Sequence, residues 1–137
     1  MDLQILSDLR VSVRAALVQA LPDVPLFSAE LNSIDDGEGG NLEEFMTLFF
    51  ADGDEDRSEQ DLDGDSYRAQ TLLTLGYFNE QARMDQALLD AQAAVLRPLL
   101  LAVPFAGYIT RAGWQYVSPL DGATAGIYFR FDVTFSH

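Results

Sequence analysis

The sequence contains no cysteine and no lysine, and its single histidine is the last residue, His137. Without cysteine the chain has no disulfide, no thiolate zinc site and no thiol nucleophile. Without lysine it has no phosphate-binding loop of the kind that depends on one. A terminal histidine rarely has the second group that holds a catalytic base in place. These missing parts predict a protein that is not an enzyme.

Negative charge dominates the sequence. The 22 acidic residues face only eight arginines, which gives a formal net charge of −14. A field of that sign repels phosphate backbones and anionic lipid, so it argues against nucleic-acid binding by charge neutralisation and against docking on membranes. The hydrophobic content of 48% is too high for a disordered acidic tail. We therefore expect one folded domain, residues 1–137.

Membrane and export signals are not expected either. No apolar run approaches the roughly 20 residues that a transmembrane helix needs. Near the start, Asp2 and Asp8 occupy the region where a signal peptide would be basic, and Arg10 and Arg14 interrupt the apolar stretch. The sequence therefore predicts neither a transmembrane helix nor a signal peptide.

Two segments have the apolar spacing of amphipathic helices. The first runs from about Asp2 to Leu21, and Pro22 marks its end. The second runs from about Glu80 to Arg97, and we expect it to end or kink at Pro98. The apolar positions of the first are Leu6, Leu9, Val13, Ala16, Leu17 and Ala20. Those of the second are Met84, Leu88, Ala91 and Val95, with Ala87 and Ala94 at the flanks.

The remaining apolar segments are typical of strands. A short strand is expected at 24–27, and longer ones at 45–50, 67–78 and 114–117, while 35–40 is expected to be a loop and 119–122 a turn. The last strand alternates strictly: Ile127, Phe129, Phe131, Val133 and Phe135 predict a buried face, and Tyr128, Arg130, Asp132, Thr134 and Ser136 a polar one. The predicted fold is α+β, a mostly antiparallel sheet with two helices on one face, in the order α-β-β-β-α-β-β.

An acidic loop is predicted at about 51–66, because like charges this dense repel one another. A specific cation site is the alternative. Asp52, Asp54 and Asp56 match the first three ligand positions of a calcium-binding loop, but Arg57 replaces its glycine and Asp63 replaces its final glutamate. A second fragment of the same kind is Asp61, Asp63 and Asp65. These six aspartates are weak candidates for metal ligands, and no other cofactor is expected.

Candidate interface residues are those that combine predicted exposure with side chains common in protein contacts. Arg68 and Gln70 lie at the end of one predicted strand that is expected to be exposed to solvent. Tyr128, Arg130 and Asp132 lie on the polar face of the last strand. We expect these five residues to contribute to contacts between subunits or with a partner.

The C-terminal two-thirds also resembles a known family. The resemblance begins at 65–70, Asp-Ser-Tyr-Arg-Ala-Gln, and continues through the strand that follows, Leu89-Asp90-Ala91 and Pro98. It then includes Gly113-Trp114-Gln115-Tyr116, the acidic turn at Asp121-Gly122 and the alternating aromatic strand, and the N-terminal amphipathic helix is shared as well. In order and spacing these features resemble the tail terminator proteins of long-tailed bacteriophages, the minor tail protein U family of lambda-like phages. Residues 23–64 do not match.

This resemblance implies a function as well as a sheet with two helices on one face. Tail terminators form hexameric rings on the last ring of the tail tube, stop its polymerisation and present a surface to the head-side connector. The expected partners are then other copies of the chain, the tail tube protein and the connector, and DNA would pass through the ring without being gripped. The expected location is the virion, after synthesis in the host cytoplasm, with Mg²⁺ or Ca²⁺ aiding assembly by screening the acidic loops.

Two other functions stay open at this point. The chain could be another ring protein of the phage neck, such as a connector or head-completion protein. It could instead be a stand-alone acidic domain that binds calcium or a small ligand.

Overall fold

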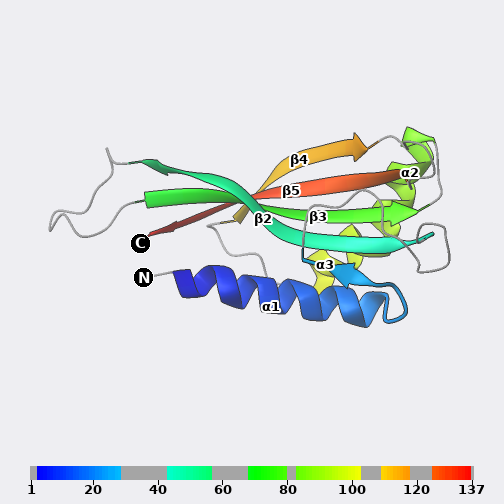
Figure 1. The fold of residues 1–137 in the computed structure, drawn as a ribbon, viewed down its shortest axis with the longest axis horizontal. Coiled ribbons are helices and arrows are strands. Elements are labelled where there is room, and N and C mark those ends of the chain that lie inside the picture. Colours follow the sequence, from blue (N-terminus) through cyan, green and yellow to red (C-terminus); the bar gives the residue numbers. More distant parts are fainter. Residues whose placement is uncertain are drawn as a thin grey trace, which may run out of the picture.

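A computed structural model describes residues 3–28, 43–56, 68–79, 83–102, 109–117 and 125–136. In these ranges, helices lie on one face of a five-stranded sheet (Figure 1). The elements are α1 (Leu3–Ala20), β1 (Leu26–Phe27), β2 (Phe45–Asp56), β3 (Arg68–Asn79), α2 (Met84–Ala91), the wide-turn segment η2 (Gln92–Leu96), α3 (Arg97–Ala102), β4 (Ile109–Val117) and β5 (Ala125–Ser136). The expected α+β class is confirmed, and the order of elements roughly matches the predicted one.

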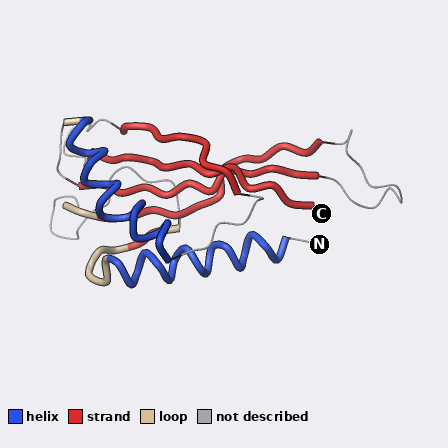
Figure 2. The backbone as a smooth tube through the Cα atoms, turned by 180° about the vertical axis from the view of Figure 1, so that it is seen from behind, coloured by secondary structure: helices blue, strands red, loops and turns tan. Residues whose placement is uncertain are grey.

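The strand order is β1-β2-β3-β5-β4. Only β1 is parallel to its neighbour, and the β2–β3, β3–β5 and β4–β5 pairs are antiparallel. The helices all lie on the same side of the sheet, while β2 and β3 continue beyond the start of α1 (Figure 2). The predicted loop at 35–40 and the predicted turn at 119–122 lie outside the described residues, as does His137.

Helix α1 agrees with its predicted apolar stripe. Leu9, Val13 and Leu17 are buried, Ala16 lies between them, and Leu6 packs against the same core at partial exposure. The helix ends two residues before Pro22, and the N–H of Leu21 still donates to the carbonyl of Leu17 over 2.9 Å. Spacing of three and four residues thus places one side of α1 against the sheet.

The helix was predicted to end or kink at Pro98, and the second helical stretch passes this residue, so an end there is wrong. Proline lacks an N–H and cannot continue a regular α-helical ladder. Here the chain widens its turn over η2, and the N–H of Arg97 donates to the carbonyl of Gln92, five residues back. Such a wide turn accommodates the proline, and α3 then continues to Ala102. The predicted stripe is also wrong at Met84, which is 51% exposed.

The main core lies between the helices and one face of the sheet. It is formed by alternate residues of β2, β3 and β5 and by the inner sides of the helices. The strand residues are Met46, Leu48, Leu73, Leu75, Tyr77, Ile127, Phe129, Phe131 and Val133, with Ile109 from β4, and the residues from the second helical stretch are Ala87, Ala91, Val95, Leu96 and Leu99. This face of β3 and β5 agrees with the predicted alternation.

A second, smaller cluster lies on the other face of the sheet. Phe45 and Phe78 stack with ring centroids 4.7 Å apart, and Tyr128 meets Phe78 edge-on at 5.4 Å. Tyr128 is only 5% exposed, so its predicted place on an exposed polar face is wrong. The alternation of β5 put it on the correct side of the sheet. That side is itself apolar here because Phe78 lies on the neighbouring strand β3, and Phe45 lies on β2, the next strand beyond it.

Strand β2 corrects the predicted acidic loop. Residues 51–56 are not a loop: they continue β2 and pair with the start of β3, as far as Asp56 opposite Arg68. The register shifts between Phe50 and Gly53, where β2 carries one extra residue. A bulge of this kind bends a strand without ending its pairing. Residues 57–66 lie outside the described ranges.

Candidate interaction surfaces

The acidic end of β2 forms one edge of the sheet. On its outer side, β1 pairs only with Met46 and Thr47. From Leu48 to Asp56 no other strand in the described ranges pairs with that side of β2. Charged residues at such an edge oppose pairing with a like-charged strand. The segment Ala51–Asp56, called the acidic edge below, therefore lies at one margin of the sheet as far as the described ranges extend.

The bulge at the start of the acidic edge is held by a side chain of β3. The hydroxyl of Thr71 donates a hydrogen bond of 2.7 Å to the carbonyl of Ala51. Thr71 is 7% exposed, so this bond is shielded from water. A carbonyl that the bulge removes from the ladder thereby gains a partner.

The predicted metal ligands divide into two groups. Asp52, Asp54 and Asp56 lie on β2, where Asp54 is opposite Gln70 and Asp56 is opposite Arg68. Asp61, Asp63 and Asp65 lie outside the described residues. Within the described part of the chain, no three acidic or histidine side chains gather as a metal site would require.

The predicted interface residues are not brought together into one surface. Gln70 is exposed, as expected, and Arg68 lies two residues before it at the start of β3. Arg130 is half-buried, donates a hydrogen bond to the side-chain oxygen of Gln115, and places its guanidinium 6.0 Å from the centre of the Tyr128 ring. Asp132 is also half-buried, opposite Leu72 and Thr110. Arg130 is therefore occupied within its own chain.

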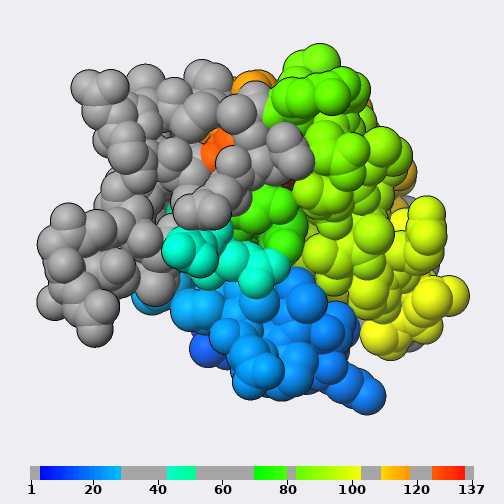
Figure 3. Space-filling view, turned by 90° about the vertical axis from the view of Figure 1, so that its right-hand side faces the viewer, coloured from blue at the N-terminus to red at the C-terminus, as the bar shows by residue number. Residues whose placement is uncertain are grey.

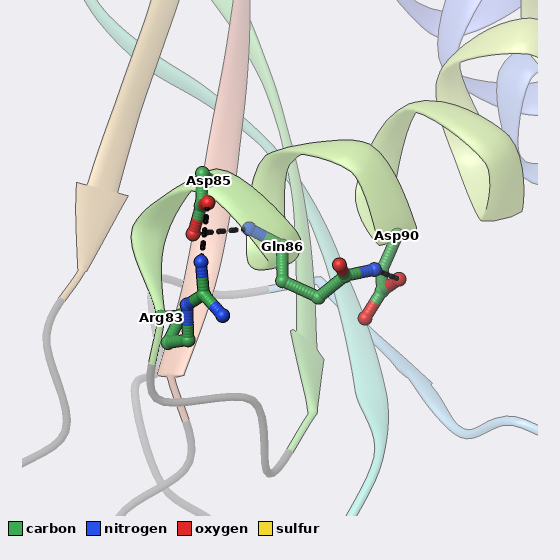
Figure 4. A network of polar contacts seen from close by, with 4 residues as sticks. All are labelled: Arg83, Asp85, Gln86 and Asp90. Atoms are coloured by element: carbon green, nitrogen blue, oxygen red, sulfur yellow. Dashed lines mark hydrogen bonds and ion pairs between the residues drawn. The ribbon is translucent and has the colours of Figure 1, made fainter.

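A polar network lies along α2 (Figure 4), and Asn79 connects it to the end of β3. Arg83 forms an exposed ion pair with Asp85 at 2.8 Å, and Asp85 accepts from the backbone N–H of Gln86 at 2.9 Å. The Gln86 N–H and then the Arg83 guanidinium hold the pKa of Asp85 below its usual range. Gln86 and Asn79 both donate to Asp90, at 2.8 and 3.3 Å. The negative charge of Asp85 in the first turn suits the positive end of the helix dipole, and the bond from Asn79 to Asp90 connects α2 to β3.

Tyr77 is the one strongly perturbed acid–base group in the described residues. Its hydroxyl donates to a carboxylate oxygen of Glu44, and its ring belongs to the main core. Burial, and then the Glu44 carboxylate, raise the pKa of Tyr77 far above its ordinary value. The hydroxyl therefore stays protonated at neutral pH and acts as a fixed hydrogen-bond donor.

The outer side of α1 carries a second apolar stripe that the sequence interpretation missed. Val11, Ala15 and Val18 follow one another at spacings of four and three residues and are all exposed. Val11 is 63% exposed and Val18 is 45% exposed. The spacing of these three residues is visible in the sequence, but the prediction considered only the longer apolar stripe that contains Val13 and Leu17. Arg10 and Arg14 lie beside these valines.

A shallow pocket lies at the wide turn of the second helical stretch. Its volume is about 230 Å³, and Gln92, Leu96, Arg97 and Leu100 line it. Figure 3 shows the adjoining face, where the end of α1 (blue) packs beside α3 (yellow). Leu100 and Leu101 are 47% and 85% exposed there. These aliphatic side chains give the helix layer a second exposed apolar region.

Comparison with known proteins identifies no family for this chain. No protein-family model matches it. A search of curated proteins finds no significant sequence match. Of the helices in the described ranges, none is long and apolar enough to cross a membrane.

Proposed function

We propose that this chain is a structural tail terminator of a long-tailed bacteriophage. Copies of the chain form a ring, expected to be a hexamer, on the end of the tail tube. The ring stops tube polymerisation and provides the surface to which the head-side connector binds. The chain acts through contacts between proteins, without catalysis.

The fold is the observation that carries this proposal. The resemblance to tail terminators implies a sheet with an N-terminal helix and a second helix on the same face, and the chain has this arrangement in this order. The last strand also has the alternating apolar face that formed part of the resemblance. This agreement in arrangement supports the proposal.

Surface properties support a role in assembly. Seven large apolar side chains are exposed in the described ranges, four of them on α2 and α3, two on α1 and one on β4. They are Val11, Val18, Met84, Leu89, Leu100, Leu101 and Trp114. Exposed aliphatic and aromatic groups of this kind are common at contacts between proteins. The net charge of −14 suits a ring through which DNA passes, because an acidic lumen does not hold the genome electrostatically.

Tube length tests the proposal. The tail tube protein of the same phage is allowed to polymerise with and without this chain, and the lengths are measured by electron microscopy. The proposal predicts shorter tubes with a ring of extra density at one end. Unchanged lengths and bare ends at a large excess of the chain would overturn it. A featureless monomer that binds calcium tightly would favour the stand-alone binding domain instead.

The charge argument has its own test. Filter binding with duplex DNA at low salt should show no tight complex. Tight binding under these conditions would contradict passage of DNA through the ring without grip. Ring formation should also respond to magnesium and to ionic strength, because like-charged copies repel one another.

A further inference from the structure

The outer side of α1 carries both apolar and charged side chains. Spacings of three and four residues place Asp8, Val11, Ala15 and Val18 along one side of the helix, with Arg14 beside them. All five are exposed, and Val11 is 63% exposed. These residues are called the α1 outer face below. Apolar groups flanked by charges of this kind are typical of contacts between proteins.

The two charged residues of this face are available for further contacts. Arg14 forms no hydrogen bond or ion pair with any residue in the described ranges. Asp8 accepts one hydrogen bond there, of 3.0 Å, from the neutral side chain of Gln4. Because Asp8 and Arg14 are six residues apart, about 9 Å along the helix axis, they do not pair within one helix. Each can therefore bind an opposite charge on another molecule.

A second copy of the chain supplies those opposite charges when two α1 helices pack antiparallel. Asp8 lies three residues before Val11, and Arg14 lies three residues after it. When Val11 of one copy faces Val11 of the other, each Asp8 therefore faces Arg14 of the other copy, and two ion pairs form. A parallel arrangement would instead place like charges together. The α1 outer face is thus complementary to itself in one direction only.

This complementarity matters because the chain is strongly acidic. Two copies with a net charge of −14 each repel, so a contact between them needs local attraction. Residues 9–22 contain two arginines and no acidic residue, so two copies meet here without bringing further carboxylates together. The same register leaves no like charges opposite each other. Its other facing pairs are Ser7 with Ala15, Arg10 with Ser12, and Gln4 with Val18.

The size of the side chains allows the two helices to approach. Ser7, Ser12 and Ala15 are small, and packed helices have axes about 8–10 Å apart. Since a Cα atom lies about 2.3 Å from the axis, the two Val11 Cα atoms come within about 5 Å of each other. The valine that is 63% exposed in one chain is then removed from water at the centre of the contact.

We propose that two copies of this chain pair through their α1 outer faces, as an antiparallel helix pair with its two-fold axis at Val11. Such a contact uses the same surface on both copies and is complete with two of them. It goes beyond the proposed function, because a ring is closed by head-to-tail contacts that this one does not supply. The pair is the state of the free chain at concentrations too low for larger assemblies. The interface predicted from sequence did not include α1.

A single introduced thiol tests the two-fold axis, because the chain has no cysteine of its own. Val11→Cys brings two thiols together within the Cα separation of about 4.4–6.8 Å that a disulfide spans. Mild oxidation at low micromolar concentration should convert most of the chain to a linked dimer on a non-reducing gel. Leu101→Cys is the control, since Leu101 is 85% exposed but lies on α3. It should link on the order of tenfold more slowly, because only random collisions join its thiols.

Positions away from the axis test the register. Val18 of one copy faces Gln4 of the other, and both side chains are exposed. Val18→Cys alone and Gln4→Cys alone should therefore link slowly, whereas an equal mixture of the two variants should link as readily as Val11→Cys. Misfolding cannot produce such a gain on mixing. A mixture that links no better than its components would contradict the antiparallel register.

Exchange of the two charges tests the ion pairs. Dimer formation of the full chain is measured by sedimentation at concentrations below those of larger assemblies. Asp8→Arg and Arg14→Asp should each weaken it on the order of tenfold, because like charges then face each other. The combined variant Asp8→Arg/Arg14→Asp restores both unlike pairs and should dimerise as the wild type does. The controls of equal charge, Asp23→Arg and Arg97→Asp, change exposed residues outside the α1 outer face and should have little effect.

The two proposals fail separately. Linkage of Val11→Cys no faster than that of Leu101→Cys would overturn pairing through α1 and would assign the face to a different surface. A combined charge variant as weak as the single ones would also overturn it. Tube capping is measured independently, so a chain that caps tubes without linking through α1 would leave the tail terminator standing. A chain that pairs through α1 but leaves tube length unchanged would overturn only the tail terminator.

Discussion

Thr71 and Ala51 join the core of the sheet to its acidic edge. The Thr71 hydroxyl donates to the Ala51 carbonyl at the bulge of β2, beyond which the acidic residues of that strand continue. On the near side of the bulge, Met46 and Leu48 belong to the main core. The bond therefore lies where β2 passes from its core residues to its acidic segment.

Removal of this hydroxyl should destabilise the protein. Thr71→Val keeps the shape of the side chain but leaves the part-buried Ala51 carbonyl without its partner. We expect a loss of about 1–2 kcal/mol in the free energy of unfolding. Urea denaturation measures this, and hydrogen exchange of the amides at 53–56 should become faster. Unchanged stability and exchange would show that the bond does not hold the bulge.

Thr74 provides the opposite case on the same strand. It is 1% exposed, and its hydroxyl has no hydrogen-bond partner in the described part of the chain. Burying a hydroxyl without a partner is unfavourable. Thr74→Val should therefore stabilise the protein by about 1 kcal/mol, whereas Thr71→Val destabilises it. If Thr74→Val also destabilises, that hydroxyl does have a partner.

Gly126 leaves space for the ring of Phe78 across the β3–β5 pair. A Cβ at position 126 would overlap that ring. Gly126→Ala should cost about 1–3 kcal/mol of stability, because the stacked ring is fully buried and cannot move away freely. In a double variant with Phe78→Leu, the two losses should be less than additive, since the smaller side chain relieves the overlap. Fully additive losses would contradict this packing.

The raised pKa of Tyr77 predicts that the protein loses stability at alkaline pH. Burial, and then Glu44, raise its pKa in the folded state, whereas an unfolded tyrosine ionises near pH ~10. The stabilisation is complete below that value and is lost as pH rises above it, because only the unfolded chain can then release the proton. Stability measured from pH 8 to 11 should fall less steeply in Tyr77→Phe than in the wild type. Parallel curves would contradict the raised pKa.

Local periodicity predicted most of the fold. The alternation of β5 correctly assigned Ile127 and Phe129 to the core, and the helical spacing of Leu9 and Val13 did the same for α1. Burial of Tyr128 could not be read this way, because it depends on Phe45 and Phe78, which are distant in sequence. Burial of both faces of a strand can be recognised only when the residues on its neighbouring strands are known.

Other predictions were wrong because an interaction with another part of the chain, or a change in the helical hydrogen bonding, outweighed the local sequence pattern. Repulsion among aspartates predicted a loop from residue 51, but backbone pairing with β3 and the Thr71 bond extend the strand to Asp56. The missing N–H of Pro98 predicted that the helix ends or kinks there. It does not end, because the N–H of Arg97 donates to the carbonyl of Gln92, five residues back, and the helix continues past the proline. Of the candidate interface, exposure was correctly predicted for Gln70 and wrongly for Tyr128.

Solution mass tests the central claim, ring assembly, most directly. Light scattering after size exclusion is measured at several concentrations, with and without magnesium. The account predicts a discrete species near six times the protomer mass of 15.1 kDa, favoured by magnesium. A single species of 15.1 kDa at every concentration and in both buffers would contradict it.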